Sequence, residues 1–434
     1  MQISEIYKIY LQHPQVTTDS RTCPEGSIFF ALKGASFNGN EYAAAALEKG
    51  CAYAVVDEAR YAVDHRYILV PDVLEALQQL AAHHRRQLTI PVLQVTGTNG
   101  KTTTKELVSA VLSRRYNTLY TQGNLNNHIG VPLTLLRITP QHEMAVIETG
   151  ANHPGEIRLL SSLVQADAGL ITNVGRAHLE GFGSFQGVKN TKGELYDSIR
   201  ERGGRILLNA LDQDLLDMAM ERGFTLYSDA LPYVEGRVEE CNPFLRMQWR
   251  EGDDEPWHTV QTHLIGAYNI ANLRAAVSVG LLYGVEPAEI DKALAEYVPT
   301  NNRSEFRQTE HNCLIVDAYN ANPSSMDAAL TNFSFIRAEH KMVILGDMRE
   351  LGAESEQEHR KVLLKLQQQK DIETVWLVGD ELRKAAEAVG MTAAVTFPTV
   401  EEVRQQLSAS PVAGRTILVK GSNGTKLFQL PELL

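Results

Sequence analysis

The chain has 434 residues, more than a single hydrophobic core usually holds, so two or three domains are expected. Its hydrophobic and charged fractions, 44% and 22%, are those of an ordinary globular protein. The net charge of −12 argues against a nucleic-acid partner, and no apolar run approaches the ~18 residues that span a bilayer. The four scattered cysteines form no C-x-x-C pair, which favours free thiols in the reducing cytoplasm.

Residues 1–88 are predicted to form a small α/β domain. The strand candidates are short apolar runs between Gly-containing turns: Ser27–Leu32, Tyr53–Val56 and Ile68–Val70. An Ala-rich helix over Tyr42–Glu48 is expected to end before Gly50, and a polar helix over Val73–Gln87 to end before Pro91. This block is joined directly to the next.

The second block, residues 89–299, opens with the most informative segment of the chain, VTGTNGKTT (Val95–Thr103). An apolar strand precedes it, and Thr104–Leu112 has the apolar spacing of a helix. A Gly-rich turn between a strand and a helix directs backbone N–H groups and the positive helix end at phosphates. Lys101 would reach the outer phosphates, and the Thr102 hydroxyl would bind Mg²⁺. The first Gly of the usual pattern is missing, but the flanking strand and helix favour an ATP loop over an accidental surface turn.

Strand candidates then alternate with helical stretches, which predicts a mostly parallel central sheet with helices on its faces. They are Val92–Val95, Met144–Glu148, Ala168–Thr172 and Arg205–Asn209. Glu148 ends a strand beside the phosphate loop, where a Mg²⁺ ligand belongs in such sheets; a solvated strand end is the alternative. Asn173 ends the next strand and leads into a loop that contains His178. Between Phe224 and His263 short alternating runs predict an antiparallel accessory sheet.

The third block, residues 300–434, follows a polar, turn-forming linker at Pro299–Asn302. Its strand candidates again alternate with helices: Cys313–Asp317, Met342–Leu345, Thr374–Val378 and Thr416–Lys420. This pattern predicts a second open α/β sheet, of the doubly wound, Rossmann-like type. The chain as a whole is therefore expected to be a three-domain α/β protein.

Seven strings in chain order carry a resemblance to a known family. They are TTDSR (Thr17–Arg21), FFALKG (Phe29–Gly34), GNLNNHIGVP (Gly123–Pro132), AHLEGFGS (Ala177–Ser184), DAYNANPSSM (Asp317–Met326), GDMRELG (Gly346–Gly352) and VKGSNGTK (Val419–Lys426). Together with the phosphate loop they resemble the Mur ligases, ATP-dependent amide-forming enzymes of peptidoglycan precursor synthesis. The resemblance covers nearly the whole chain, from a first domain for the uridine nucleotide to the C-terminal domain.

The resemblance implies an amide ligase with small-molecule substrates, UDP-MurNAc-tripeptide and D-Ala-D-Ala. ATP would phosphorylate the tripeptide carboxylate, and the amine of D-Ala-D-Ala would attack the acyl phosphate, with two Mg²⁺ ions as cofactors. We expect a monomeric cytoplasmic enzyme that neither inserts into a membrane nor binds nucleic acid. Closure of the third domain about the linker would keep the acyl phosphate from water.

The family's functional residues map onto positions of this chain. The implied catalytic residues are Lys101, Glu148, His178, Lys192 and Arg303. The implied nucleotide-binding residues are Gly97, Thr98, Asn99, Gly100, Lys101, Thr102, Thr103, Asn269, Asn272, Arg303 and Asp317, and the metal-binding ones are Thr102, Glu148, His178 and Lys192. The implied substrate-binding residues are Ser20, Arg21, Asn126, Asn127, Tyr319, Asn320 and Asn322. Lys192 falls where many members carry a carbamylated lysine, whose negative charge supports Mg²⁺.

Two departures and three alternatives accompany this interpretation. Tyr268 stands where many members have His, and FNGNEY (Phe37–Tyr42) replaces a more usual Asp-Gly-His string near the uridine site. A sister ligase adding the third residue is one alternative, but its usual Asp-Asn-Pro-Arg string is absent. A folylpolyglutamate-type synthetase lacks the TTDSR domain. A catalytically silent nucleotide-binding module is disfavoured because Lys101 and Glu148 are both present.

Overall fold

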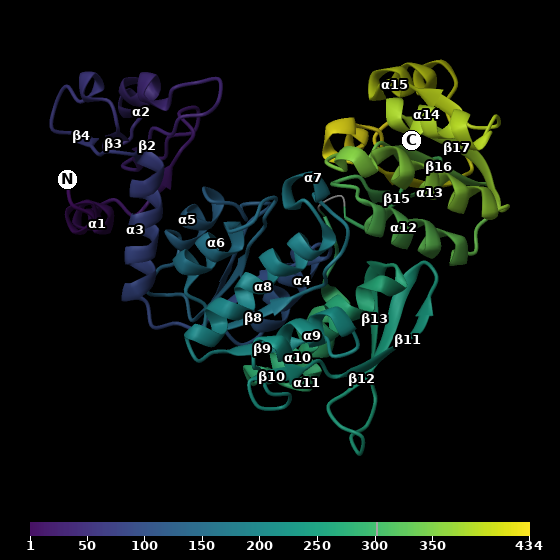
Figure 1. Ribbon diagram of the computed structural model, residues 1–434, viewed down its shortest axis with the longest axis horizontal. Helices are drawn as coiled ribbons and strands as arrows, with labels where there is room; N and C mark the ends of the chain where they lie inside the picture. Colours follow the sequence, from purple (N-terminus) through teal and green to yellow (C-terminus); the bar gives the residue numbers. More distant parts are fainter. Residues whose placement is uncertain (301–302) are drawn as a thin grey trace.

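The computed structural model describes residues 1–300 and 303–434, so the linker predicted at Pro299–Asn302 lies partly outside the described residues. Within that part of the chain the strands form four sheets, with order β1-β2-β3-β4, β10-β9-β8-β5-β7-β6, β11-β12-β13 and β14-β15-β19-β16-β17-β18. In Figure 1 the N-terminal sheet lies at the upper left and the C-terminal sheet at the upper right, with the central sheet below and between them. The predicted fold class, α/β with a mostly parallel central sheet and a doubly wound C-terminal sheet, is confirmed.

The N-terminal sheet is parallel throughout and is joined to the central domain by one long helix. Its strands are β1 (Val16–Thr17), β2 (Ile28–Phe30), β3 (Tyr53–Val56) and β4 (Tyr67–Leu69), and its helices are α1 (Ile3–Gln12), α2 (Ala43–Glu48) and α3 (Val73–Gln87). On α3, the guanidinium of Arg85 is buried and donates to the carbonyls of Val164 and Gln165, both at 2.9 Å. Tyr10 on α1 donates to the carbonyl of Leu136 at 2.7 Å. These bonds fix the first sheet to the central domain.

The central sheet is also parallel throughout. Its strands are β5 (Val92–Thr96), β6 (Thr118–Tyr120), β7 (Met144–Glu148), β8 (Ala168–Ile171), β9 (Arg205–Leu208) and β10 (Ala230–Pro232). Its helices are α4 (Lys101–Leu112), α5 (Gly130–Leu135), α6 (Glu156–Val164), α7 (Leu179–Phe182), α8 (Phe185–Glu201), α9 (Gln213–Glu221), α10 (Ile270–Leu282) and α11 (Pro287–Glu296). The predicted strands agree within one residue.

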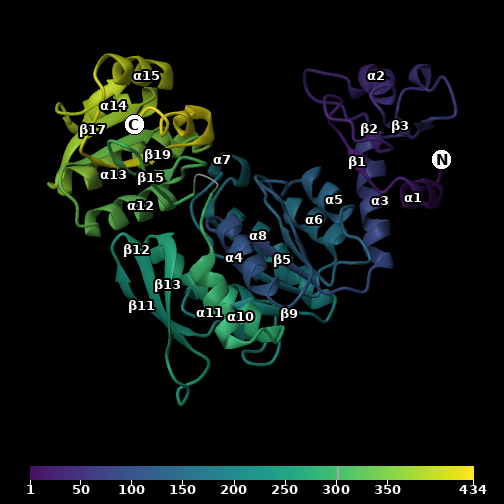
Figure 2. The same cartoon turned by 180° about the vertical axis from the view of Figure 1, so that it is seen from behind.

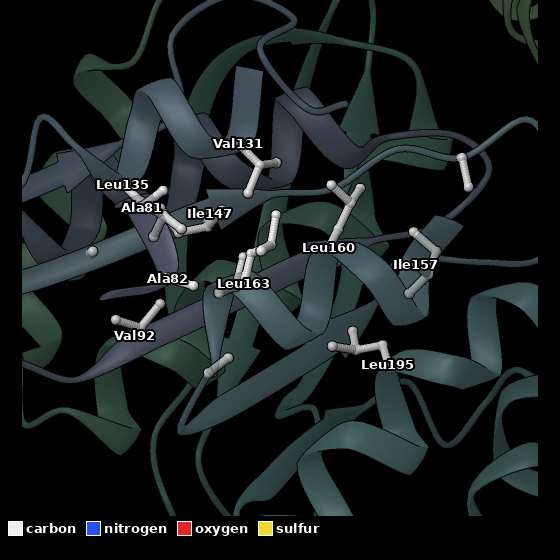
Figure 3. Packing of buried hydrophobic residues seen from close by; sticks show 14 of the residues in the cluster. Ala81, Ala82, Val92, Val131, Leu135, Ile147, Ile157, Leu160, Leu163 and Leu195 are labelled. Carbon is white, nitrogen blue, oxygen red and sulfur yellow. The ribbon is translucent and has the colours of Figure 1, made fainter. Parts of the chain in front are cut away.

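Helices cover both faces of the central sheet, because its strands alternate their apolar side chains between the two. Val92 and Ile147 pack on one face against α5 and α6, as Figure 3 shows with Leu160 and Leu163. Leu93 and its neighbours on the other face pack against α4, α10 and α11. The phosphate loop therefore emerges from a strand that is buried on both sides.

The predicted antiparallel accessory sheet is confirmed as β11 (Glu235–Cys241), β12 (Phe244–Arg250) and β13 (His258–Ile265). Trp249 on β12 is buried and donates to Asp291 on α11 at 2.7 Å, which anchors the sheet to the central domain. The sheet also meets the C-terminal domain, below α12 in both views (Figures 1 and 2), where Phe244 packs edge-on against Phe306. It thus braces one domain against the other.

The C-terminal sheet is parallel except for its edge strand β14. Its strands are β14 (Glu305–Gln308), β15 (Cys313–Asp317), β16 (Lys341–Gly346), β17 (Ile372–Val378), β18 (Val395–Phe397) and β19 (Thr416–Lys420). The helices are α12 (Pro323–Phe335), α13 (Ser355–Gln368), α14 (Asp380–Val389) and α15 (Val400–Ala409). The first three helices pack on one face and α15 on the other, as a doubly wound sheet requires. None of the described helices is long and apolar enough to cross a membrane.

Candidate active site

A cavity of about 760 Å³ lies between the central and C-terminal domains, at the carboxyl ends of their strands. It brings together most of the residues that the sequence singled out: Thr98, Asn99, Gly100, Lys101, Thr103, Asn126, Asn127, Glu148, His178, Asn269, Asn272, Arg303, Asp317, Tyr319, Asn320 and Asn322. Five other predicted residues do not line it: Gly97, Thr102, Lys192, Ser20 and Arg21. The cavity is where an open α/β sheet normally binds its ligand.

Two glycines give the phosphate loop its shape. Gly97 has a φ of +145°, and a Cβ atom there would lie 2.0 Å from the Thr172 hydroxyl. Gly100 has a φ of +77°, and a Cβ atom there would lie 2.7 Å from the Asn272 amide. Both positions therefore exclude other residues. Because Gly100 turns the chain immediately before the helix, α4 begins at Lys101, three residues earlier than the apolar spacing predicted.

Lys101 folds back over this loop. Its ammonium donates to the carbonyls of Gly97 and Thr98, both at 2.9 Å. Burial lowers its pKa to about 8, an effect that the nearby Glu148 carboxylate opposes and the Arg303 guanidinium reinforces. Within the described residues, the hydrogen bonds of the Lys101 ammonium go to neutral carbonyls. A buried cation held in this way is electrostatically under-compensated, which favours an anionic ligand beside it.

Glu148 ends β7 and is 1% exposed. Its Oε1 atom accepts from the Thr102 hydroxyl at 3.1 Å and from the Asn126 amide at 2.7 Å. Its Oε2 atom is buried and has no hydrogen-bond partner within the described residues. A buried carboxylate with one oxygen held and the other unsatisfied has the lone pairs that a cation needs. The Glu148 carboxylate and the neighbouring Thr102 hydroxyl are therefore donors of the kind that suits the Mg²⁺ ion implied by the sequence.

The protein alone does not surround such a cation. In the described chain, no group of three or more His, Cys, Asp or Glu residues is arranged to hold a metal ion. Mg²⁺ commonly retains several waters and is bound by one or two side chains together with substrate phosphates. The donor set around Glu148 therefore matches a nucleotide-dependent Mg²⁺ site better than a resident structural metal.

The two remaining predicted metal ligands lie near each other but in different surroundings. His178, at the start of α7, lines the cavity and contacts Glu350 of the C-terminal domain. Burial lowers the pKa of His178, which favours the neutral imidazole that binds metals, although the Glu350 carboxylate opposes this. Lys192, on α8, is 2% exposed and lies 5.6 Å from the centre of the Phe182 ring. Burial and the charge of Lys101 hold the pKa of Lys192 well below its usual range.

Two asparagines that were predicted to bind the nucleotide, Asn269 and Asn272, have a structural role. Asn269 donates to the carbonyl of Ile265 at 2.8 Å and accepts from Asn272 at 2.7 Å. Asn272 in turn accepts from Thr104 on α4 at 3.0 Å. This chain of bonds ties the start of α10 to the helix that follows the phosphate loop, so the two asparagines fix the loop as well as line the cavity.

The C-terminal domain forms the opposite wall of the cavity. The Arg303 guanidinium lies 3.7 Å from the centre of the Tyr319 ring, a cation–π contact. Asn322 caps α12 by accepting from the Ser325 backbone at 2.9 Å, and its amide donates to Asn99 of the phosphate loop at 2.8 Å. A C-terminal side chain therefore contacts the phosphate loop directly.

Sequence reasoning gave no role to two residues that complete the site. Lys420, at the end of β19, is 1% exposed and donates to Asp317 at 2.6 Å. The sequence signal was the VKGSNGTK string, since β19 pairs with β15 and brings Lys420 opposite Asp317. Asn173 accepts from the Asn99 backbone at 3.0 Å through its side chain, and its own carbonyl accepts from Thr98 at 3.0 Å. Asn173, which follows β8, therefore holds the phosphate loop in place.

Other predicted substrate residues serve local structure. Asn127 accepts from the backbones of Ile129 and Gly130, at 3.1 and 2.8 Å, at the start of α5. Ser20 and Arg21 lie in the N-terminal domain, outside the cavity. There Arg21 is exposed and bonds to Asp19 at 2.8 Å, and the Ser20 carbonyl accepts from Lys49 at 2.8 Å. A ligand that reached both places would have to extend beyond the cavity.

The cavity combines a phosphate loop, a buried carboxylate suited to a cation, and a facing wall that carries Arg303 and Lys420. Together these features define a nucleotide-dependent enzyme. Three family descriptions match the chain: Mur ligase middle domain over residues 95–280, Mur ligase, glutamate ligase domain over residues 302–423, and Mur ligase family, catalytic domain over residues 14–85. The chain belongs to the Mur ligase family.

Individual relatives match along nearly the full length. The chain is 36% identical to the UDP-N-acetylmuramoyl-tripeptide–D-alanyl-D-alanine ligase of Escherichia coli, over 96% of this chain and 93% of the relative. It is 33% identical to the ligase of the same name from Bacillus subtilis, over 99% and 96%. The structure of MurF from Acinetobacter baumannii superimposes with a TM-score of 0.83 at 32% identity, over 96% of this chain and 92% of that one.

Proposed function

We propose that the protein is an ATP-dependent amide ligase that joins D-Ala-D-Ala to the terminal carboxylate of UDP-MurNAc-tripeptide. The products would be UDP-MurNAc-pentapeptide, ADP and phosphate, a step of peptidoglycan precursor synthesis. The observation that carries the proposal is the cavity in which the phosphate loop, the half-satisfied Glu148 and the cations of the C-terminal wall meet. The names of the full-length relatives supply the substrates.

The reaction has two chemical stages. A carboxylate oxygen of the tripeptide attacks the γ-phosphorus of ATP, which forms an acyl phosphate and releases ADP. The amine of D-Ala-D-Ala then attacks the acyl carbon, and the tetrahedral intermediate expels phosphate. Both reactants of the first stage are anionic, so their approach requires positive charge at the site.

Residues of both domains would supply that charge. Lys101 and the N–H groups at the start of α4 would hold the outer phosphates, and Arg303 would approach them from the opposite wall. Thr102 and Glu148 would hold one Mg²⁺, and His178 with Lys192 a second. Bound there, Mg²⁺ would neutralise phosphate charge and polarise the phosphoryl group. Lys420 would position Asp317 through their ion pair.

Lys192 is suited to the carbamylation that the family resemblance implied. Only a neutral amine adds to CO₂, and burial together with Lys101 lowers the pKa of Lys192 and so favours the neutral form. The resulting carbamate would be an anion in a site otherwise rich in positive charge. We therefore propose Lys192 as the modified residue.

The remaining roles follow from the same geometry. Asn269 and Asn272 would contact adenine from the α10 side, and Ser20 with Arg21 would face the uridine end of the substrate in the first domain. Asn126, Asn127, Tyr319, Asn320 and Asn322 would contact the peptide part of the substrates. We further propose domains at 1–88, 89–299 and 300–434, acting in a cytoplasmic monomer, because ATP use and four free cysteines both fit that compartment.

The test is phosphate release from Mg·ATP with UDP-MurNAc-tripeptide, in the presence and absence of D-Ala-D-Ala. Turnover that depends on the dipeptide supports the proposal. Turnover only when a UDP-dipeptide meets a free diamino acid would assign the chain to the sister ligase instead. If neither pair reacts, added bicarbonate distinguishes a missing carbamate on Lys192 from a catalytically silent protein.

A further inference from the structure

Two of the four cysteines lie together in the N-terminal domain, away from the cavity. Cys51 follows α2 and is 4% exposed, within an apolar cluster that includes Phe29 and Ala46. Cys23 is half-buried and packs against the same cluster. Neither thiol has a role in the proposed reaction. Cys241 and Cys313 lie in the accessory and C-terminal sheets instead.

The chain segments that carry this pair are fastened side by side. Lys49 donates to the Ser20 carbonyl, Gly26 to the Gly50 carbonyl and Ala52 to the Ser27 carbonyl, at 2.8, 2.7 and 2.8 Å. Cys23 and Cys51 lie on the two segments that these three hydrogen bonds join, and the Ser27 hydroxyl is 3.2 Å from the Cys51 sulfur. The Cys23 thiol is close enough to Cys51 to contribute to the raised pKa of the latter. The fold therefore holds the two sulfurs as near neighbours.

The two thiols differ in exposure, which determines which of them an external oxidant reaches first. Burial raises the pKa of Cys51 to about 11, so at neutral pH it holds its proton and meets little solvent. Cys23 is partly accessible, and its sulfur contacts the Ser20 carbonyl at 3.6 Å and the Asp19 carbonyl at 3.9 Å. An external oxidant would thus meet Cys23 first, with Cys51 positioned behind it to resolve the product.

We propose that Cys23 and Cys51 form a reversible thiol–disulfide site that controls the shape of the Thr17–Arg21 segment. The co-reactant is a low-molecular-weight disulfide. The Cys23 thiolate attacks one of its sulfurs and releases one small thiol. The Cys51 thiol then gives up its proton to solvent as its sulfur displaces the second small thiol from the mixed disulfide. Overall the protein loses two electrons and two protons, and the external disulfide is reduced to two thiols.

Disulfide formation requires the loop to move. The two sulfurs must approach to about 2 Å, so Cys23 must turn away from the carbonyls of Asp19 and Ser20 and toward the cluster. Those carbonyls belong to the segment proposed for the uridine end of the substrate, so this part of the inference rests on the proposed function. Loss of contacts worth about one hydrogen bond predicts a KM for UDP-MurNAc-tripeptide about fivefold higher in the oxidised enzyme.

The first experiment is chemical and needs no activity. The full-length protein is incubated in buffers of increasing oxidised-to-reduced glutathione ratio, alkylated, digested and mapped by mass spectrometry. A crosslink between the Cys23 and Cys51 peptides, with Cys241 and Cys313 alkylated, is expected, and a reductant should reverse it. Stable glutathione adducts on Cys23 without the crosslink, or no reaction at Cys23, would overturn the site.

The second experiment measures the consequence with the oxidised and reduced wild type. The KM for UDP-MurNAc-tripeptide should rise with the crosslink while kcat and the KM for ATP change little, and C23S and C51S should abolish the response. C313S serves as the matched control and should respond as the wild type does. A crosslink that leaves this KM unchanged would refute control of the segment. A reduced enzyme without any ligase activity would instead refute the proposed function and leave the chemical result standing.

Discussion

The substitution E148Q tests the cation site in two independent ways. It keeps the shape of a side chain that is 1% exposed and removes its negative charge. In the glutamine, Oε1 can still accept from Thr102 and Asn126. The atom that is Oε2 in Glu148, which has no partner among the described residues, becomes the NH₂ group of the side-chain amide. The substitution therefore leaves the packing intact and removes a cation ligand.

Stability and activity should change in opposite directions. A buried carboxylate with an unsatisfied oxygen is costly, and Lys101 compensates for it only in part, so without a cation E148Q should raise the unfolding free energy by about 1–2 kcal/mol. With a charge that supports the transition state removed, kcat should fall about 10²- to 10³-fold. Saturating Mg·ATP should stabilise the wild type by about 2–3 kcal/mol and the variant by clearly less.

Urea denaturation with and without Mg·ATP, together with phosphate release, measures all three quantities. The matched control is E143Q, an exposed carboxylate just before the same strand, which should leave all three unchanged. If E148Q were less stable than the wild type without a cation, and equally stabilised by Mg·ATP, the argument that Glu148 is an unsatisfied cation ligand would be refuted.

Three further outcomes are expected. R85M should lower the unfolding free energy by about 3 kcal/mol in urea denaturation, because it removes the donor to the buried Val164 carbonyl and to the part-buried Gln165 carbonyl. R86M, at an exposed position of α3, should have little effect. The pKa of Lys101 is about 8 in the folded protein and 10.5 in the unfolded chain, so between these pH values the folded state binds fewer protons than the unfolded state. The unfolding free energy of the wild type should therefore rise with pH across this window relative to that of K101M. A difference that stays constant with pH would contradict the assigned pKa. N322S should keep the cap of α12 but lose the hydrogen bond to Asn99. We expect kcat/KM to fall about tenfold while the unfolding free energy changes by less than about 0.5 kcal/mol. A parallel loss of stability would show that Asn322 acts only as a helix cap.

Most strands could be predicted because buried parallel strands are continuous apolar runs, as Met144–Glu148 and Cys313–Asp317 are. β14 was missed because Glu305–Gln308 is polar, and only its antiparallel pairing with β15 makes it a strand. The start of α4 was predicted three residues late, because hydrophobic spacing does not show where a glycine with positive φ turns the chain.

The candidate site was predictable in its components. The phosphate loop follows from local chemistry, since glycines, a lysine and a threonine at this spacing between a strand and a helix suit phosphates and Mg²⁺ whatever surrounds them. Glu148 was predicted from its position at the end of a strand beside that loop. Most of the other predicted residues came from the family resemblance, and most of all these residues line the cavity. Their individual roles in binding remain proposals.

The sequence by itself determined the order of helices and strands along the chain, the phosphate loop and the family. Each of these depends on residues that are close together in the chain or on short sequence motifs. Only the tertiary structure decided that Asn126 holds one oxygen of Glu148, that Asn322 contacts Asn99, and that Lys420 faces Asp317. These partners are separated by between 22 and 223 residues along the chain. Which side chains meet depends on how distant backbone segments pack against each other, and a pattern along the sequence contains no information about their relative orientation.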